Sequence, residues 1–205
     1  AAGGAPQIVT IGDIDGDGKP DLAVANFTSN SVSVLRNTSV TGTVSFAAKV
    51  DFATGSSPWS VSMGDLNGDG KTDLAVANRT GFSVSVLRNT STSGGVSFAA
   101  KVDFSAGSSP YSVSIGDLDG DGKPDLAVAS NGDNTASVYK NTSTSGGVSF
   151  AAKVDFSAGS GPVSICIGDI DGDGKPDLAV SNNSGNNASV FRNTSTPGII
   201  NSGSF

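Results

Sequence analysis

Histidine and glutamate are absent from this sequence, and cysteine, methionine and tryptophan occur once each. Without histidine, the chain cannot build a Ser-His-Asp or Cys-His nucleophile system or a zinc site that uses histidine. A single cysteine also excludes an intrachain disulfide. Basic residues number 12 against 19 acidic ones, and the formal charge of -7 argues against nucleic acid as a partner. We therefore expect a protein that is not an enzyme.

Long hydrophobic runs are also missing, since none approaches the roughly 20 residues that a membrane helix needs. The chain opens at Ala1 with neither an initiator methionine nor a leader, so we expect it to be processed or cut from a longer protein. Its 205 residues, 36% of them hydrophobic, suffice for one ordinary core or for an array of small repeated units.

The repeats decide between these two possibilities. An acidic, glycine-rich segment that ends in Asp-Leu-Ala-Val occurs four times at a spacing of 52 residues. It begins at Gly12, Gly64, Gly116 and Gly168, in step with Pro6, Pro58, Pro110 and Pro162 and with Asn-Thr-Ser at Asn37, Asn89, Asn141 and Asn193. We expect a single repeat array over 1–205, divided into units 1–53, 54–105, 106–157 and 158–205.

Each unit alternates small and branched residues with a period of two, which predicts strands and no helix. In unit two the expected strands are 60–63, 74–77 and 83–86, followed by a run at 96–98 that continues toward 101–104. Four short strands in a repeat of this length predict an all-β fold, a β-propeller-type array of four 52-residue, four-stranded blades. A β-helix or a sandwich is the alternative.

The candidate metal ligands lie in the loop between the first and second strands. Carboxylates at loop positions 1, 3 and 5 can converge on one cation if a glycine at position 6 turns the chain, and position 7 adds a backbone carbonyl. The expected ligands, with lysine acting through its carbonyl while its side chain extends into solvent, are Asp13, Asp15, Asp17, Lys19 and Asp21; Asp65, Asn67, Asp69, Lys71 and Asp73; Asp117, Asp119, Asp121, Lys123 and Asp125; and Asp169, Asp171, Asp173, Lys175 and Asp177.

Calcium is the expected ion, at about four per chain, because an all-protein carboxylate cage suits it better than magnesium. An EF-hand is excluded, since its position 12 requires a glutamate and is valine in all four units. The loops hold 15 of the 19 aspartates, and four divalent ions would change the formal charge from -7 to about +1. The alternative is a set of solvated Asx-turns without metal.

These loops resemble the FG-GAP/VCBS repeats of integrin α-subunit propellers and of bacterial surface proteins, over nearly the whole chain. The resemblance implies calcium in the loop that joins the first two strands of each blade, with Asn67 as a mild departure. It also implies a role in adhesion, in carbohydrate binding, or as a passenger beside catalytic domains. The family usually closes with seven blades, which leaves ring closure open for four.

The four units differ mainly after the repeat proline and in the turn after the second strand. Both places are expected on one face, opposite the calcium loops, as functional loops on a rigid scaffold often are. The candidate ligand-face residues are Trp59, Tyr111, Arg79, Phe82 and Phe27. The alternative is that these turns simply drift and the aromatic residues fill the mouth of a channel.

Three smaller features give further expectations. Cys166 alternates with isoleucines and is expected to be a buried, inert thiol. Arg36, Arg88, Lys140 and Arg192 are expected on solvated strand ends or paired with aspartate. Sequons at Asn26, Asn37, Asn78, Asn89, Asn141, Asn182 and Asn193 allow a glycoprotein, although Asn-Thr-Ser is also ordinary turn chemistry.

Unit four contains about three strands, because Gly203-Ser204-Phe205 resembles 148–150 and stops before the equivalent of the outer strand. Its third strand, around 188–192, would present an unpaired edge, so we expect completion by a neighbouring copy or by a further repeat.

Together these features predict a calcium-stabilised, non-catalytic, extracellular or cell-surface module for adhesion or structural assembly, whose variable face binds a protein or a glycan. A carbohydrate-binding propeller and a passenger domain of a larger secreted enzyme are the alternatives.

Overall fold

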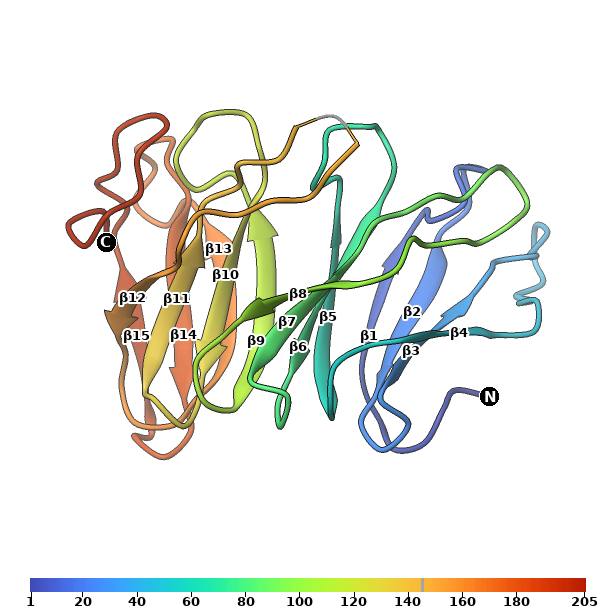
Figure 1. The fold of residues 1–205 in the computed structure, drawn as a ribbon, viewed down its shortest axis with the longest axis horizontal. Coiled ribbons are helices and arrows are strands. Elements are labelled where there is room, and N and C mark those ends of the chain that lie inside the picture. The colour runs from blue at the N-terminus through green and yellow to red at the C-terminus, as the bar shows by residue number, and fades with distance from the viewer. Residues whose placement is uncertain (145) are drawn as a thin grey trace.

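The protein is described by a computed structural model over residues 1–144 and 146–205. These residues form four antiparallel sheets and no helix, which confirms the all-β prediction. The sheets follow one another along the long axis of the molecule in chain order (Figure 1). Accordingly, the described part of the chain contains no helix that could cross a membrane.

Each sheet is a meander of strands that are consecutive in the sequence. Sheet 1 contains β1 (Pro6–Gly12), β2 (Asp21–Asn26), β3 (Ser31–Leu35) and β4 (Val50–Ala53), and sheet 2 contains β5 (Pro58–Gly64), β6 (Asp73–Asn78), β7 (Ser83–Leu87) and β8 (Val102–Ser105). Sheet 3 contains β9 (Pro110–Gly116), β10 (Asp125–Ser130), β11 (Thr135–Tyr139) and β12 (Val154–Ser157), and sheet 4 contains β13 (Pro162–Gly168), β14 (Asp177–Asn182) and β15 (Asn187–Phe191).

The expected strands of unit two agree with β5, β6 and β7, but the expected strand residues 96–98 are wrong. This run lies in the loop between β7 and β8, where Phe98 makes an isolated bridge to Asn89. The loop folds back on itself because Thr92 and Gly95 close a tight turn and the Ser91 hydroxyl accepts the Ser97 amide at 3.0 Å. The outer strand β8 therefore begins only at Val102.

Both faces of the inner sheets are buried, because each sheet packs against the next. Between sheets 1 and 2, a face that combines Ala23 and Ala25 with the valines of β3 meets a face that includes Leu74 and Val76. Clusters built mainly from the equivalent positions lie between sheets 2 and 3 and between sheets 3 and 4. Each face thus combines small residues of one strand with larger residues of its neighbour, and the alternation of alanine or serine with valine in the sequence reflects packing on both faces.

Sheet 4 has three strands among the described residues, so β15 pairs with β14 on one side only. As expected, the C-terminal segment repeats the loop of unit three, because Thr194 donates to Ser204 O as Thr142 does to Ser149 O. The expectation for Cys166 is wrong, since this residue is exposed. It lies on the outer face of sheet 4, against which the described residues pack no further sheet.

Candidate metal centres

The acidic loops join the first strand of each sheet to the second and lie along one edge of the molecule, at the top of Figure 1. In the first loop Asp13 follows directly after β1, and Asp21 is the first residue of β2. Gly16 and Gly18 adopt φ values of 73° and 84°, a region that favours glycine. All four loops repeat this pair of left-handed glycines, so position 4 needs glycine as well as the predicted position 6.

Backbone amides curl each loop around its own carboxylates. Asp13 accepts the amides of Gly16 at 2.8 Å and Gly18 at 2.9 Å. Asp21 accepts the amide of Ile14 at 3.0 Å through one oxygen and that of Asn37 at 2.7 Å through the other. These hydrogen bonds hold the carboxylates at fixed positions before any cation arrives, which lowers the cost of binding one.

Three of the four loops gather carboxylate oxygens from three aspartates within 4.8 Å of one another, close enough to share one metal ion. The three sets are Asp13, Asp15 and Asp17; Asp117, Asp119 and Asp125; and Asp169, Asp171 and Asp177. In the second loop Asn67 occupies the position of the second carboxylate, and its side-chain amide donates to Asp69 at 3.1 Å. An amide oxygen is also a ligand that calcium accepts.

Basic side chains form ion pairs with the loop carboxylates in units three and four. The Lys140 ammonium contacts both Asp119 and Asp121, and the Arg192 guanidinium contacts Asp171 and Asp173. The expected pairing of this ladder with aspartate is therefore confirmed at Lys140 and Arg192. Arg36 approaches Asp15 more loosely, at 4.0 Å.

The lysine at loop position 7 is exposed at Lys71 and Lys123, as expected, and half-buried at Lys175. In units two to four its ammonium also donates to a backbone carbonyl in the segment after the third strand. Lys71 donates to Ser91 O at 2.8 Å, Lys123 to Ser143 O at 3.0 Å and Lys175 to Ser195 O at 2.8 Å. The lysine thus ties two loops of one unit together.

Burial changes the proton affinity of two predicted ligands. It raises the pKa of Asp73 to about 6 and that of Asp125 to about 7, and the neighbouring loop carboxylates add to the effect. Both side chains are fully buried within the inner units. An ionised carboxylate is therefore costly at these positions unless a cation accompanies it.

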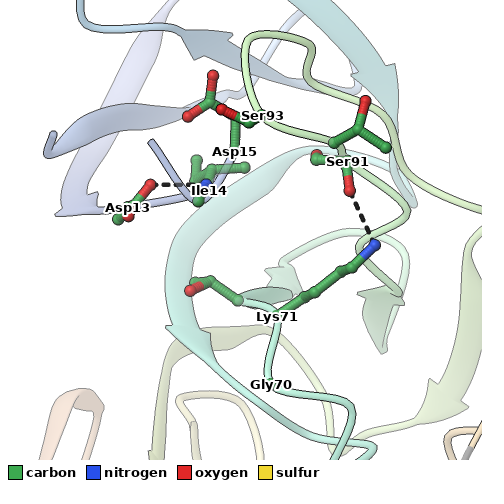
Figure 2. A pocket seen from close by; sticks show the side chains of 10 residues that line it. Asp13, Ile14, Asp15, Gly70, Lys71, Ser91 and Ser93 are labelled. Carbon is green, nitrogen blue, oxygen red and sulfur yellow. Dashed lines mark hydrogen bonds between the residues drawn. The ribbon is translucent and has the colours of Figure 1, made fainter. Parts of the chain in front are cut away.

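Cavities separate successive acidic loops along this edge. The first has a volume of about 510 Å³, and equivalent cavities of about 640 and 220 Å³ follow between the next loops. Figure 2 shows Asp13 and Asp15 on one side of the first cavity, with the Lys71 side chain extending toward Ser91 on another. Every cavity therefore places the carboxylates of one unit beside the lysine of the next.

The loops also connect neighbouring sheets through the repeated Asn-Thr-Ser. The Asn89 side-chain amide donates to Ile14 O of the preceding loop at 2.7 Å and to Thr72 O of its own loop at 2.8 Å. Asn141 and Asn193 make the same pair of bonds one and two units later. All seven sequon asparagines are at most 8% exposed, so the folded chain does not present them for glycosylation.

The candidate ligand face lies at the opposite edge of the sheets. There the turn after each second strand meets the segment before the first strand of the same sheet, as in the bond from Arg79 N to Ser57 O at 3.0 Å. Trp59 packs edge-on against Phe27 at 5.7 Å and lies 4.8 Å from Tyr111. The Arg79 guanidinium covers both the Trp59 and Tyr111 rings at 5.1 and 4.7 Å. Four of the five predicted residues thus form one cluster across three sheets.

Phe82 is the fifth predicted residue of this face. It is 52% exposed and lies in the turn before β7 with φ of 50°. The aromatic contacts of the described residues do not include it.

An array of small antiparallel sheets with repeated acidic loops defines a class of repeat protein. Comparison of the sequence with known protein families identifies the family. The family described as FG-GAP-like repeat matches residues 13–76, 66–128 and 117–180. The chain belongs to this family, as its sequence predicts. A search of curated proteins found no match.

Solved structures share the fold at low sequence identity. BBS1N, solved in complex with ARL6DN, has a TM-score of 0.56 at 11% identity over 96% of this chain and 58% of its own. The rhamnogalacturonan lyases PL11 of Bacillus licheniformis and YesW each have a TM-score of 0.55 over 90% of this chain and 43% of theirs, at 15% and 17% identity. The chain thus spans about half the length of these proteins, and the likeness shows the fold alone.

Proposed function

We propose that this chain is a calcium-stabilised, non-catalytic module that works outside the cell in adhesion or structural assembly, with its sheets as blades of a β-propeller. The main observation in favour of a calcium site is that the Lys140 ammonium lies between the Asp119 and Asp121 carboxylates of the third loop. A cationic group at this point indicates that the loop oxygens converge where a positive charge is stabilised.

The donor set favours calcium over other metals. The described loops offer only carboxylate, amide and carbonyl oxygen, and the sequence contains no histidine to attract a transition metal. The ligands in each loop would be the residues at positions 1, 3, 5 and 9 and the carbonyl of position 7. Bound calcium would neutralise the clustered carboxylates, including Asp73 and Asp125, whose raised pKa values reflect the cost of their ionisation.

An extracellular location follows from the affinity expected of such loops. Extracellular calcium modules have dissociation constants of roughly 10⁻⁴ to 10⁻³ M, so that they fill outside the cell and empty in the cytosol. A module whose fold depends on calcium would therefore be stable at a cell surface. The sequence lacks the histidine and glutamate that serve as general bases in many enzymes, which supports a non-catalytic role.

Metal counting tests the calcium proposal. Dialysis against calcium followed by elemental analysis should give about four ions per chain, one per loop. The variant Asp121→Ala should bind one ion fewer, whereas Asp51→Asn, outside the loops and still able to accept from Ser33, should bind as the wild type does. Retention of all ions by Asp121→Ala, or no bound calcium in the wild type, would contradict the proposal.

A carbohydrate-binding role is the second candidate, and the cluster of Phe27, Trp59, Arg79 and Tyr111 favours it. Aromatic rings beside a fixed cation are suited to stacking and hydrogen bonding with a sugar. Arg79 covers Trp59 and Tyr111, so a sugar would have to share these rings with the guanidinium. A glycan array separates this role from adhesion to protein. The length of the native gene decides whether the chain is a passenger of a larger secreted enzyme.

A further inference from the structure

The three interfaces between adjacent sheets are built from equivalent residues. The residue after the first loop aspartate is buried in each, with Ile14 at 2% exposure, Leu66 at 1% and Leu118 at 1%. The valine at the fourth position of the third strand is equally buried at Val34, Val86 and Val138. These side chains form one face of each interface, and the first strand of the next sheet supplies part of the other.

The outer face of sheet 4 carries this same pattern without a partner sheet in the described chain. Ile170 is 56% exposed and Val190 is 61% exposed, although their equivalents in sheets 1 to 3 are buried. Cys166 lies beside them, on the exposed side of β13.

The outer face of sheet 1 carries the complementary pattern. Val9 is 55% exposed, whereas its equivalents Val61, Val113 and Ile165 are at most 4% exposed. Ile11 is 65% exposed, whereas Met63, Ile115 and Ile167 pack against the clusters between sheets. The two ends of the array thus expose the two halves of one interface.

A glycine fixes the register of this interface. A Cβ on Gly12 would lie 2.8 Å from Met63 Sδ, and one on Gly64 would lie 2.8 Å from Ile115 Cγ2. Gly116 receives Ile167 in the same way, at 3.1 Å. The equivalent Gly168 faces open space, which is the position that Ile11 of another sheet 1 would fill.

Polar groups at the two ends match as well. Asn89, Asn141 and Asn193 each donate to a carbonyl of the preceding loop. At the two ends of the array, the equivalent donor is the Asn37 side chain and the equivalent acceptor is the Ile170 carbonyl. Ser60 and Ser112 accept amides from the next first strand, namely Val113 N at 3.4 Å and Ile165 N at 3.3 Å. If sheet 1 of another molecule lay on sheet 4 in the same register, Val9 N would donate to Ser164 Oγ and Asn37 Nδ2 would donate to Ile170 O.

We propose that sheet 4 of one copy of this chain packs against sheet 1 of a second copy, head to tail, in the register of the internal interfaces. Ile11 would lie over Gly168, and Val9 would pack against the surface that contains Ile170 and Val190. The partner is a second copy because both halves of an interface that occurs three times within the chain are present at its two end sheets, and both are exposed. A head-to-tail contact either closes into a ring or continues as a longer assembly.

This proposal concerns the faces of the end sheets and not the free edge of β15. Completion of sheet 4 by an added strand, which the sequence predicts, is a separate contact along that edge. Burial of the exposed valines and isoleucines is the driving force for the face contact. The proposal holds whether or not the aromatic cluster binds a ligand.

Molecular mass in solution tests the proposal. Light scattering of the 205-residue chain in calcium should give twice its 20.2 kDa, or a higher multiple, with dissociation on dilution. Ile11→Asp and Val190→Asp should each weaken association by roughly tenfold or more, because each places a charge in the apolar interface. Val102→Asp, an exposed valine on β8 in the middle of the array, is the matched control and should associate as the wild type does.

Mixing the two variants distinguishes the orientation. Each variant retains one intact face, so Ile11→Asp and Val190→Asp should remain monomeric alone and form mixed pairs together. Recovery on mixing also shows that both variants are folded. A symmetric contact between two sheet 1 faces would instead respond to Ile11→Asp alone, and that result would overturn the proposal, as would a wild type that is monomeric at every concentration.

Thiol labelling gives an independent readout. Cys166 is the single cysteine of the chain and lies on the proposed contact face. Its reaction with a maleimide should slow as wild-type concentration rises but stay constant for Val190→Asp. Equal rates for both proteins would contradict burial of this face.

Discussion

Removal of calcium should destabilise this protein by an amount comparable to the stability of an ordinary domain. At ten times its dissociation constant, a ligand that binds only the folded state adds about 1.4 kcal/mol per independent site. Four such loops add about 6 kcal/mol, against the 5 to 15 kcal/mol typical of whole domains. For a chain of this size, each kcal/mol changes the melting temperature by roughly 2 to 4 °C, so the expected shift is about 12 to 24 °C.

Circular dichroism measures this shift directly. The chain is melted at saturating calcium, in excess EDTA, in magnesium, and in sodium chloride of equal ionic strength. The salt control matters because 15 of 19 aspartates lie in the loops, so simple screening also relieves their repulsion. Calcium should raise the melting temperature well beyond the salt control, and Asp121→Ala should lose about a quarter of the gain. A melting curve that EDTA leaves unchanged would refute the reasoning.

Three further outcomes are expected. In the proposed calcium sites, calcium and protons would compete for Asp73 and Asp125, whose folded pKa values of about 6 and 7 exceed the unfolded value near 4. Without calcium, the stability that these two groups contribute is fully present near pH 4 and is lost as the pH rises through 7, so the melting-temperature gap between calcium and EDTA should widen from pH 5 to pH 8. If a glycan binds the aromatic cluster, Trp59→Ala should abolish binding on an array with calcium content intact; loss of binding only together with unfolding would assign Trp59 to the core. In urea titrations of the dilute, monomeric chain, Asn141→Ala should lower the free energy of unfolding by about 1 kcal/mol more than Asn37→Ala, because within one chain Asn141 bonds to the preceding unit and Asn37 does not; equal losses would contradict that role.

Much of the architecture is predictable because the sequence contains four copies of one pattern. The spacing of 52 residues and the alternation of two residues give the sheets, and the ending of unit four at its third strand follows by alignment of the copies. The acidic loops are equally legible, since their ligand spacing is local. The glycine at position 6 is also predictable from local spacing, whereas the need for glycine at position 4 is evident only from the φ values of Gly16 and its equivalents.

Other features depend on partners far away in the sequence, and the sequence does not show them. Asn89 looks like ordinary turn chemistry until its bond to Ile14, 75 residues earlier, is seen. The Lys71 side chain is expected only to extend into solvent, and its bond to the Ser91 carbonyl, 20 residues later, has no local signal. Cys166 follows the apolar alternation of a buried strand, yet it is exposed because its sheet is the last of the array. Alternation predicts which residues share a face, but not which faces are covered.

The acidic loop both positions the carboxylates and contacts the next sheet, and the sequence motif shows only the first of these roles. Asp21 accepts the Ile14 amide, the Ile14 side chain lies in the core between sheets 1 and 2, and the Ile14 carbonyl accepts the Asn89 side chain of the next unit. A loop whose carboxylates repel one another would therefore loosen a core side chain and an inter-sheet hydrogen bond at the same time. Neutralising the loop consequently stabilises the stacking of sheets as well as the loop itself. This coupling explains physically why a repeat array of small sheets can carry so dense a set of like charges, because the charges lie where a bound cation would strengthen each interface in turn.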